Sequence, residues 1–104
     1  MKSNIQIYNY EDTPVSFKQE DNVMINATQM AKPFGKMPAD FLKTKQTKNF
    51  IKELDAMKNI IPDNLVKVVN GCDNFGTWMQ EDVALEFAHW LSPKFANWCN
   101  DRIK

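Results

Sequence analysis

The stretch from Lys67 to Phe95 restricts the possible folds of this chain more than any other part of the sequence. Two short extended runs flank a polar segment that contains glycine, and an amphipathic helix begins directly after the second run. A further helix is expected from Ser92 and Pro93, because serine caps helices and proline fits their first turn. A hairpin followed at once by two helices predicts a small domain of mixed α and β structure.

The composition is that of one folded domain. The chain has 104 residues, of which 43% are apolar, and it contains seven Phe and three Trp. That length supports a single hydrophobic core, and the apolar content is too high for a disordered chain. No apolar run approaches the roughly 20 residues of a membrane span, and the N-terminus lacks the apolar stretch of a signal peptide. Cys72 and Cys99 therefore predict two reduced thiols in a cytoplasmic protein.

Charged residues are distributed unevenly, although the net charge is zero. Residues 32–58 carry seven lysines and three acidic residues, a balance of +4, whereas residues 1–31 and 59–104 each have a balance of −2. A surface that binds phosphates needs a local excess of positive charge rather than a global one. The same lysines would also suit an ordinary solvent-exposed helix face.

The first quarter of the chain alternates apolar and polar residues, which predicts a small antiparallel meander. Strands are expected at 5–10, 15–18 and 23–25, with turns at 11–14 and 19–22. Asn26 is then predicted to cap a short helix, with Gln29 as its capping-box partner. Pro33 disfavours helical geometry at the residue before it, so this helix should end there, with Gly35 in the following turn.

Two more helices are predicted in the lysine-rich segment. One is expected over residues 38–45, because its leading proline fits the first turn of a helix. Thr47 is expected to cap the other. The apolar stripe of that helix is formed by Phe50, Leu54 and Met57. A short helix, a tight turn and a second helix with a basic outer face are typical of a helix-turn-helix, although two simply packed helices give the same pattern.

A hairpin and two C-terminal helices complete the predicted fold. Strands are expected at 66–69 and 76–79, and Gly71 and Asn74 tolerate the positive φ that a hairpin tip requires. The apolar stripes of the two helices are formed by Val83, Phe87, Trp90 and Leu91 and by Phe95, Trp98, Cys99 and Ile103. We therefore predict an α+β fold of small antiparallel strands, a helix-turn-helix, a β-hairpin wing and two closing helices.

Three stretches of the sequence resemble the KilA-N domain, a DNA-binding module found in proteins of large DNA viruses, phages and bacteria. They are VMINATQMAKPFGK at 23–36, FGTWMQEDVALEFAHWLSP at 75–93 and KFANWCNDRI at 94–103. The resemblance implies a fold shared with the APSES DNA-binding domain of fungal transcription factors. It also implies a single domain over residues 1–104 that binds double-stranded DNA in a phage, viral or bacterial regulatory protein.

The resemblance implies recognition by the helix at 38–45, with support from the wing at 70–77. Candidate phosphate contacts are Lys36, Lys43, Lys45 and Lys48, candidate contacts to base edges are Asp40 and Thr44, and candidate wing contacts are Asn70 and Asn74. Asn26 and Thr28 match the family motif but are expected to be structural, and Trp78 is expected in the core because an indole buries a large area.

Several features differ from the family pattern and predict weak or strongly salt-sensitive binding. The wing sequence CDNFG lacks basic residues, and Asp73 would repel phosphate. The only arginine, Arg102, lies near the C-terminus, so the bidentate arginine–guanine contact is missing from the proposed surface. Family members are often longer, and this chain ends inside a predicted helix, so we expect a fragment of a longer protein or a minimal form.

An enzyme is not expected, and no cofactor is predicted. Cys72, His89 and Cys99 are one ligand short of a zinc site, and a nucleophile–base pair would depend on the same single histidine. The main alternative is a protein-interaction module that keeps the fold without binding DNA, which the zero net charge and acidic wing favour. RNA recognition would need exposed aromatic side chains, whereas most of those here have core spacing. The oligomeric state stays open.

Overall fold

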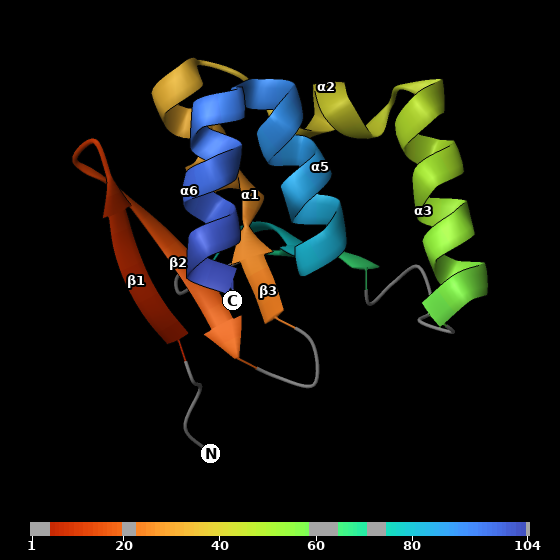
Figure 1. Ribbon diagram of the computed structural model, residues 1–104, viewed down its shortest axis with the longest axis horizontal. Coiled ribbons are helices and arrows are strands. Elements are labelled where there is room, and N and C mark those ends of the chain that lie inside the picture. Colours follow the sequence, from red (N-terminus) through yellow and green to blue (C-terminus); the bar gives the residue numbers. More distant parts are fainter. Residues whose placement is uncertain (1–4, 20–22, 59–64, 71–74, 104) are drawn as a thin grey trace.

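A five-stranded antiparallel sheet packed with helices forms the domain (Figure 1). The computed structural model describes residues 5–19, 23–58, 65–70 and 75–103. The strands are β1 (Ile5–Tyr10), β2 (Thr13–Gln19), β3 (Val23–Asn26), β4 (Val66–Val69) and β5 (Gly76–Gln80), in the order β1-β2-β3-β5-β4. The helices are α1 (Ala27–Ala31), the 3-10 helix η1 (Lys32–Phe34), α2 (Pro38–Leu42), α3 (Lys45–Lys58), α5 (Glu81–Leu91) and α6 (Pro93–Ile103). The predicted α+β class is confirmed.

The core lies between the sheet and the helices α1, α5 and α6. The register places Phe17, Ile25 and Met79 opposite one another across three neighbouring strands, and each is at most 1% exposed. The helices contribute the buried residues Met30, Ala31, Val83, Ala84, Phe87, Ala88, Phe95, Ala96 and Cys99. Trp78 on β5 is also buried, as predicted. The apolar spacing of these segments was therefore a reliable guide to their inner faces.

The N-terminal meander forms as predicted, with a tighter first turn. Glu11 and Asp12 have φ values of 47° and 69°, and β2 already begins at Thr13. Positive φ at both central residues is the conformation that two-residue hairpin turns favour, because its twist matches that of the strands. The turn predicted over 11–14 is therefore only two residues long.

The helix predicted over residues 38–45 is present but ends three residues earlier, and the next helix begins before its predicted cap. α2 ends at Leu42, α3 begins at Lys45, and Lys43 and Thr44 lie between them. Thr44 rather than Thr47 caps α3, since Oγ1 of Thr44 accepts a hydrogen bond from the backbone N of Thr47 at 3.2 Å. Threonine is a suitable cap at either position, so the sequence alone does not show which of the two residues caps α3.

Other local expectations also change. Asn26 caps α1 as predicted, but Oε1 of Gln29 accepts from the backbone N of Ser16 at 2.6 Å instead of completing a capping box. Met57 is 77% exposed and lies outside the apolar stripe predicted for α3, and Trp90 is 37% exposed. The expectations for Gly71 and Asn74 fall outside the described residues.

The predicted hairpin of β4 and β5 is present, but it is an integral part of the sheet. β5 pairs with β3 through Met24, Ile25 and Asn26 on one side and with β4 on the other. A hairpin that pairs in this way cannot move independently of β3, because each shared strand fixes the position of the next. The hairpin predicted as a wing is therefore anchored in the sheet through β3.

Candidate nucleic-acid interface

Asn26 and Thr28 join the start of α1 to the start of β5. Oδ1 of Asn26 accepts from the backbone N of Gln29 at 3.1 Å, and its Nδ2 donates to the backbone O of Phe75 at 3.0 Å. Oγ1 of Thr28 accepts from the backbone N of Thr77 at 3.0 Å. Asn26 is 0% exposed, and a buried polar group without a partner costs about 1–3 kcal/mol. These bonds give both residues the structural role that the sequence predicts.

Gly76 is needed at this junction for its backbone conformation and its small size. Its φ of 131° is one that L side chains rarely adopt. A Cβ at this position would lie 2.9 Å from Oδ1 of Asn26 and 3.1 Å from Oγ1 of Thr28. The hydrogen-bonded residues are 49 positions apart in the chain. The Asn-Ala-Thr motif therefore contacts the segment that contains the Gly-Thr-Trp motif.

Thr44 forms the corner between α2 and α3. Its Oγ1 lies 2.9 Å from the backbone O of Phe41 and 2.6 Å from Oγ1 of Thr47, in addition to accepting the backbone N of Thr47. The first amides of a helix need such partners, so this group of bonds fixes where α3 starts. Figure 1 shows that α3 then stands at one side of the molecule, beyond α5.

An ion pair joins the other end of α3 to the start of α5. Nζ of Lys58 lies 2.7 Å from Oδ2 of Asp82, and this hydrogen bond and the charge of Asp82 raise the pKa of Lys58. Partial burial acts to raise the pKa of Asp82, but hydrogen bonds from Lys58 and Gln80 and the charge of Lys58 together lower it below 3.8. Partial burial and the charge of Asp82 raise the pKa of Glu81 above 4.5.

Three lysines of α3 form an exposed row, here called the basic stripe: Lys45, Lys48 and Lys52. Their i, i+3, i+7 spacing at about 100° per residue places them on one side of the helix, opposite the buried Leu54. Asn49 is exposed on the same side. Within the part of the chain that the structure describes, none of the three lysines forms an ion pair. Their charge is therefore available to a ligand.

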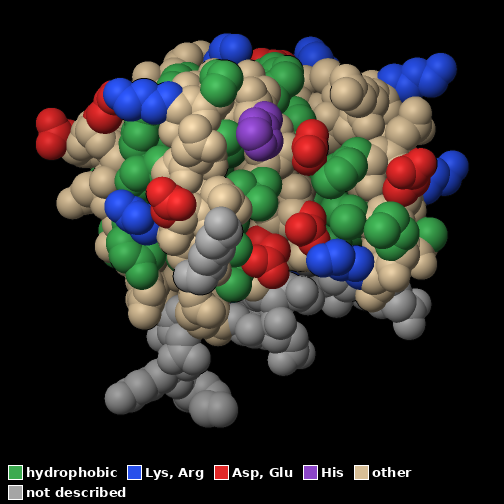
Figure 2. Space-filling view, viewed as in Figure 1, with side chains coloured by type: hydrophobic (Ala, Val, Ile, Leu, Met, Phe, Trp, Pro, Cys, Tyr) green, Lys and Arg blue, Asp and Glu red, His purple; other side chains and the backbone are tan. Residues whose placement is uncertain are grey.

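Lysines project from the edge of the domain around α2 and α3, where acidic side chains also lie (Figure 2). The face formed by α5 and α6 likewise carries acidic and basic side chains together. Nζ of Lys43 lies 3.3 Å from Oδ1 of Asp40, and both side chains are more than half exposed. Such an exposed pair adds little stability, so both groups can exchange partners readily.

The predicted site residues lie on several elements. Asp40 is on α2, and Lys43, Thr44, Lys45 and Lys48 follow at the α2–α3 corner and along α3.

The remaining predicted residues are elsewhere in the chain. Nζ of Lys36 lies 4.7 Å from the ring centroid of Trp90 on α5, and Asn70 is exposed directly after β4. Asn74 lies outside the described residues. The predicted site omits Lys52 and Asn49. Helical spacing counted from Lys45 indicates both residues. The predicted helix ended at Lys45, however, so Lys45 was not considered together with them.

The described residues contain few other side chains suited to catalysis or metal binding. The thiol of Cys99 is buried, and burial raises its pKa to about 12, so it stays protonated and unreactive at neutral pH. No group of three or more His, Cys, Asp and Glu residues among those described is arranged to hold a metal ion. No helix in the described ranges is long and apolar enough to cross a membrane.

Comparisons with known proteins identify the family of this chain. The family model of the KilA-N domain matches residues 8–104, and the chain therefore belongs to the KilA-N family, as its motifs predict. It is similar to the uncharacterized protein FPV248 of fowlpox virus (strain NVSL), with 27% identity over 93 residues that cover 84% of this chain. The chain spans 61% of the length of that protein. No solved structure matches the chain. KilA-N domains are in general DNA-binding modules.

Proposed function

We propose that this KilA-N domain binds double-stranded DNA through the α2–α3 corner and the basic stripe. The observation that carries the proposal is the row of three exposed lysines without ion-pair partners among the described residues. Displacing the counterions that condense on DNA is the main source of affinity for such a row. The stripe is about 10 Å long at 1.5 Å per residue, which is similar to the width of the major groove.

Each residue of the proposed interface has a role that its chemistry allows. Lys43, Lys45 and Lys48 contact phosphates, and Lys52 extends this row along α3. Lys36, two residues before α2, adds a further positive charge. These contacts position the domain on the duplex without reading its sequence.

Sequence would be read by polar side chains at the corner. Asp40 is exposed and can accept from the amino group of cytosine, whereas the hydroxyl of Thr44 already has hydrogen-bond partners as the cap of α3. Asn49 lies in the stripe and has the amide that pairs with adenine. The segment at 70–77, with Asn70 and Asn74, would support binding from the hairpin.

The test is fluorescence anisotropy of a labelled random-sequence duplex, titrated with the protein across a range of salt concentrations. Each phosphate contact contributes about −0.9 to the slope of log affinity against log salt. Lys45→Ala with Lys48→Ala should therefore weaken binding to all sequences and reduce the slope by about 2. Lys94→Ala, which removes an exposed lysine of α6, is the control and should leave the slope unchanged.

Two outcomes would contradict the proposal. An unchanged slope in the double variant would remove the basic stripe from the interface. Absence of duplex binding even at low salt would favour the protein-interaction module, which the zero net charge of the chain also suits.

A further inference from the structure

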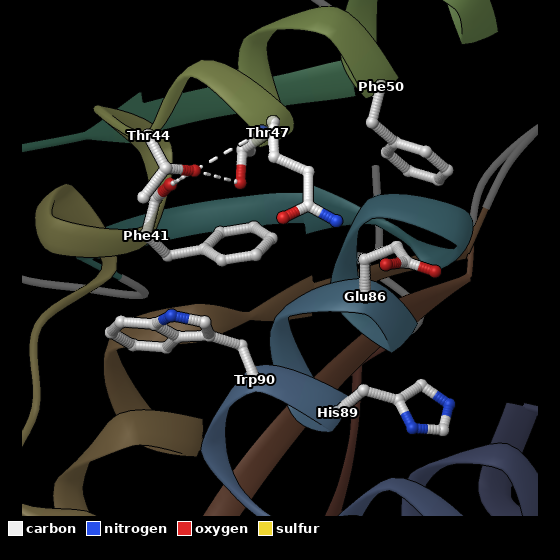
Figure 3. Close-up of a pocket in the computed structure, with 8 residues that line it drawn as sticks. Phe41, Thr44, Thr47, Phe50, Glu86, His89 and Trp90 are labelled. Atoms are coloured by element: carbon white, nitrogen blue, oxygen red, sulfur yellow. Dashed lines mark hydrogen bonds between the residues drawn. The ribbon is translucent and has the colours of Figure 1, made fainter.

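A pocket of about 320 Å³ opens between α3 and α5 (Figure 3). Three aromatic residues line it, namely Phe41, Phe50 and Trp90. The polar residues of its lining are Thr44, Gln46, Thr47, Glu86 and His89. This volume is at the lower end of the range for small-molecule sites, so the pocket suits one small ring system rather than an extended ligand.

The aromatic walls offer surface for stacking. In Figure 3, Phe41 and Trp90 lie at one end of the pocket, and Phe50 and Glu86 lie at the other. Trp90 is 37% exposed but already stacks on Phe87 and has Nζ of Lys36 over its ring. Phe50 is half-buried and has no partner ring among the described residues, so its ring is the one available for stacking. Aromatic rings that are open to solvent in this way bind flat heterocycles, because every nucleobase has a face on which to stack.

The polar groups can bond to the edge of such a heterocycle. The carboxylate of Glu86 is exposed and forms no ion pair within the described ranges, and a carboxylate only accepts hydrogen bonds. The amide of Gln46 both donates and accepts. The hydroxyls of Thr44 and Thr47 bond to each other and are largely committed. The free acceptor in the pocket therefore favours a ligand with N–H donors.

Lysines adjoin residues that line this pocket. Nζ of Lys36 lies over the ring of Trp90 at 4.7 Å, and the exposed Lys43 and Lys45 flank Thr44 in the chain. A ligand with a neutral ring and an attached phosphate would match this arrangement, with the ring inside and the phosphate at the lysines. A simple anion would instead meet the carboxylate of Glu86 inside the pocket.

We propose that this pocket takes up an unpaired nucleobase that carries an exocyclic amino group. The base stacks against Phe50, and its amino group donates to Glu86 at the same end of the pocket. Cytosine, adenine and guanine have such a group, whereas thymine offers only the single N–H of its ring. This inference rests on the proposed function, because DNA bound along the basic stripe supplies the base, and uptake is easiest where the base is already unpaired.

The first test uses deoxynucleoside monophosphates and the whole chain, labelled with ¹⁵N for NMR. We expect saturable shifts of the amide signals of residues 44–50 and 86–90 with dCMP, dAMP or dGMP. The dissociation constant for the best of these should be at least about fivefold lower than that for dTMP, as one good base-edge bond predicts. Equal shifts with deoxyribose 5-phosphate would show binding to lysines alone and would overturn the inference.

Variants separate the pocket from general charge effects. Glu86→Gln should abolish the preference over dTMP, whereas Glu53→Gln, the same change at an exposed site of α3 outside the pocket lining, should preserve it. Phe50→Leu should lose most of the affinity, and Phe50→Tyr, which keeps the ring, should retain it. Preference unchanged in Glu86→Gln would overturn the role of the carboxylate. Pocket shifts with N-acetyl-lysine methylamide instead of nucleotides would assign the pocket to a basic protein side chain.

A second test distinguishes failure of this inference from failure of the proposed function. A duplex with an abasic site opposite one cytosine should bind more tightly than the matched duplex, and Glu86→Gln should remove the difference. Matched-duplex binding without any nucleotide shifts at the pocket would overturn the inference and leave the proposed function standing. If nucleotides bind at the pocket but the duplex affinity is the same in the lysine variants as in the unmodified chain, the proposed interface would instead be overturned.

Discussion

The junction of β3, α1 and β5 differs from the helix α3 in how many buried residues and hydrogen bonds hold it in place. At the junction, Asn26, Ala27, Ile25 and Met79 are all 0% exposed, and hydrogen bonds tie α1 to β5. Of the 14 residues of α3, only Thr47 and Leu54 are buried. The ends of α3 are attached by the bonds of the Thr44 corner and by the ion pair between Lys58 and Asp82.

This difference separates the residues that define the fold from those proposed to carry the function. Within the family motifs, Asn26, Ala27 and Trp78 are buried, and Gly76 has a backbone conformation that restricts the residue there. The lysines stand on the less buried helix, because charged side chains are almost never fully buried and must reach solvent to meet phosphates. A domain of this kind can therefore keep its motifs while its binding surface varies.

The largest expected effect is at the core. Trp78→Ala removes a side chain that is 3% exposed and should cost about 3–5 kcal/mol in the free energy of unfolding, measured by urea denaturation. The matched change on α3, Met57→Ala, removes a side chain that is 77% exposed and should change stability by less than about 0.5 kcal/mol. Similar losses in both variants would show that α3 is as firmly integrated as the sheet.

A smaller loss is expected at the junction itself. Gly76→Ala introduces a Cβ 2.9 Å from Oδ1 of Asn26 at a φ of 131°, and should cost about 1–3 kcal/mol through backbone strain and the steric contact. Circular dichroism during thermal unfolding would measure it. Gly35→Ala is the comparison, because its φ is 65° but no atom lies within 4 Å of the new Cβ. A larger loss at Gly35 than at Gly76 would contradict the steric argument.

The corner between α2 and α3 should respond locally. Thr44→Ala removes the cap of α3 and should cost about 1 kcal/mol. Because α3 buries few side chains, amide hydrogen exchange should accelerate in its first turns and stay unchanged in α5. Thr44→Ser keeps the hydroxyl and serves as the control. Uniform acceleration over the whole chain in Thr44→Ala would mean that α3 unfolds only with the core.

The smallest effect is expected at the ion pair between α3 and α5. Since the folded-state pKa of Asp82 is lowered, its contribution is present above its unfolded pKa and disappears as the pH falls through the folded value. The raised pKa of Lys58 means that its contribution is present below 10.5 and is lost as the pH rises through the folded value. Lys58→Met should therefore be less stable than the unmodified chain at pH 7 and equally stable once Asp82 is protonated.

Urea denaturation at pH 7 and at pH 2.5 would test this, with Lys52→Met as the control without an ion pair. Glu81 acts in the opposite direction, since its raised pKa means that acidification through 4.5 relieves the cost of its charge. The charge of Lys58 lowers the pKa of Glu81, so Lys58→Met also increases this cost at pH 7, and the cost disappears once Glu81 is protonated. A difference that persists at pH 2.5 would assign the effect of Lys58 to packing rather than to charge.

Much of the fold and part of the site could be predicted from the sequence. The strands, the Asn26 cap and the inner faces of α5 and α6 follow from alternation, helical spacing and capping chemistry, which depend on residues close together in the chain. The break at Thr44 could not be predicted, because Thr44 and Thr47 are both suitable caps. The lysine-rich segment was recognised as a whole, but its alignment into the stripe of Lys45, Lys48 and Lys52 depends on where α3 begins.

By itself, the sequence determined the order of the elements, the residues that face the core and the family to which the chain belongs, because local periodicity and short motifs record these properties directly. Only the tertiary structure decided that the β4–β5 hairpin pairs with β3, that Gly76 must approach Asn26 and Thr28, and that a pocket opens between α3 and α5. These features arise from contacts between residues far apart in the chain. No local sequence pattern encodes such contacts, because each residue has to fit a partner that is distant in the chain and close only in the folded domain.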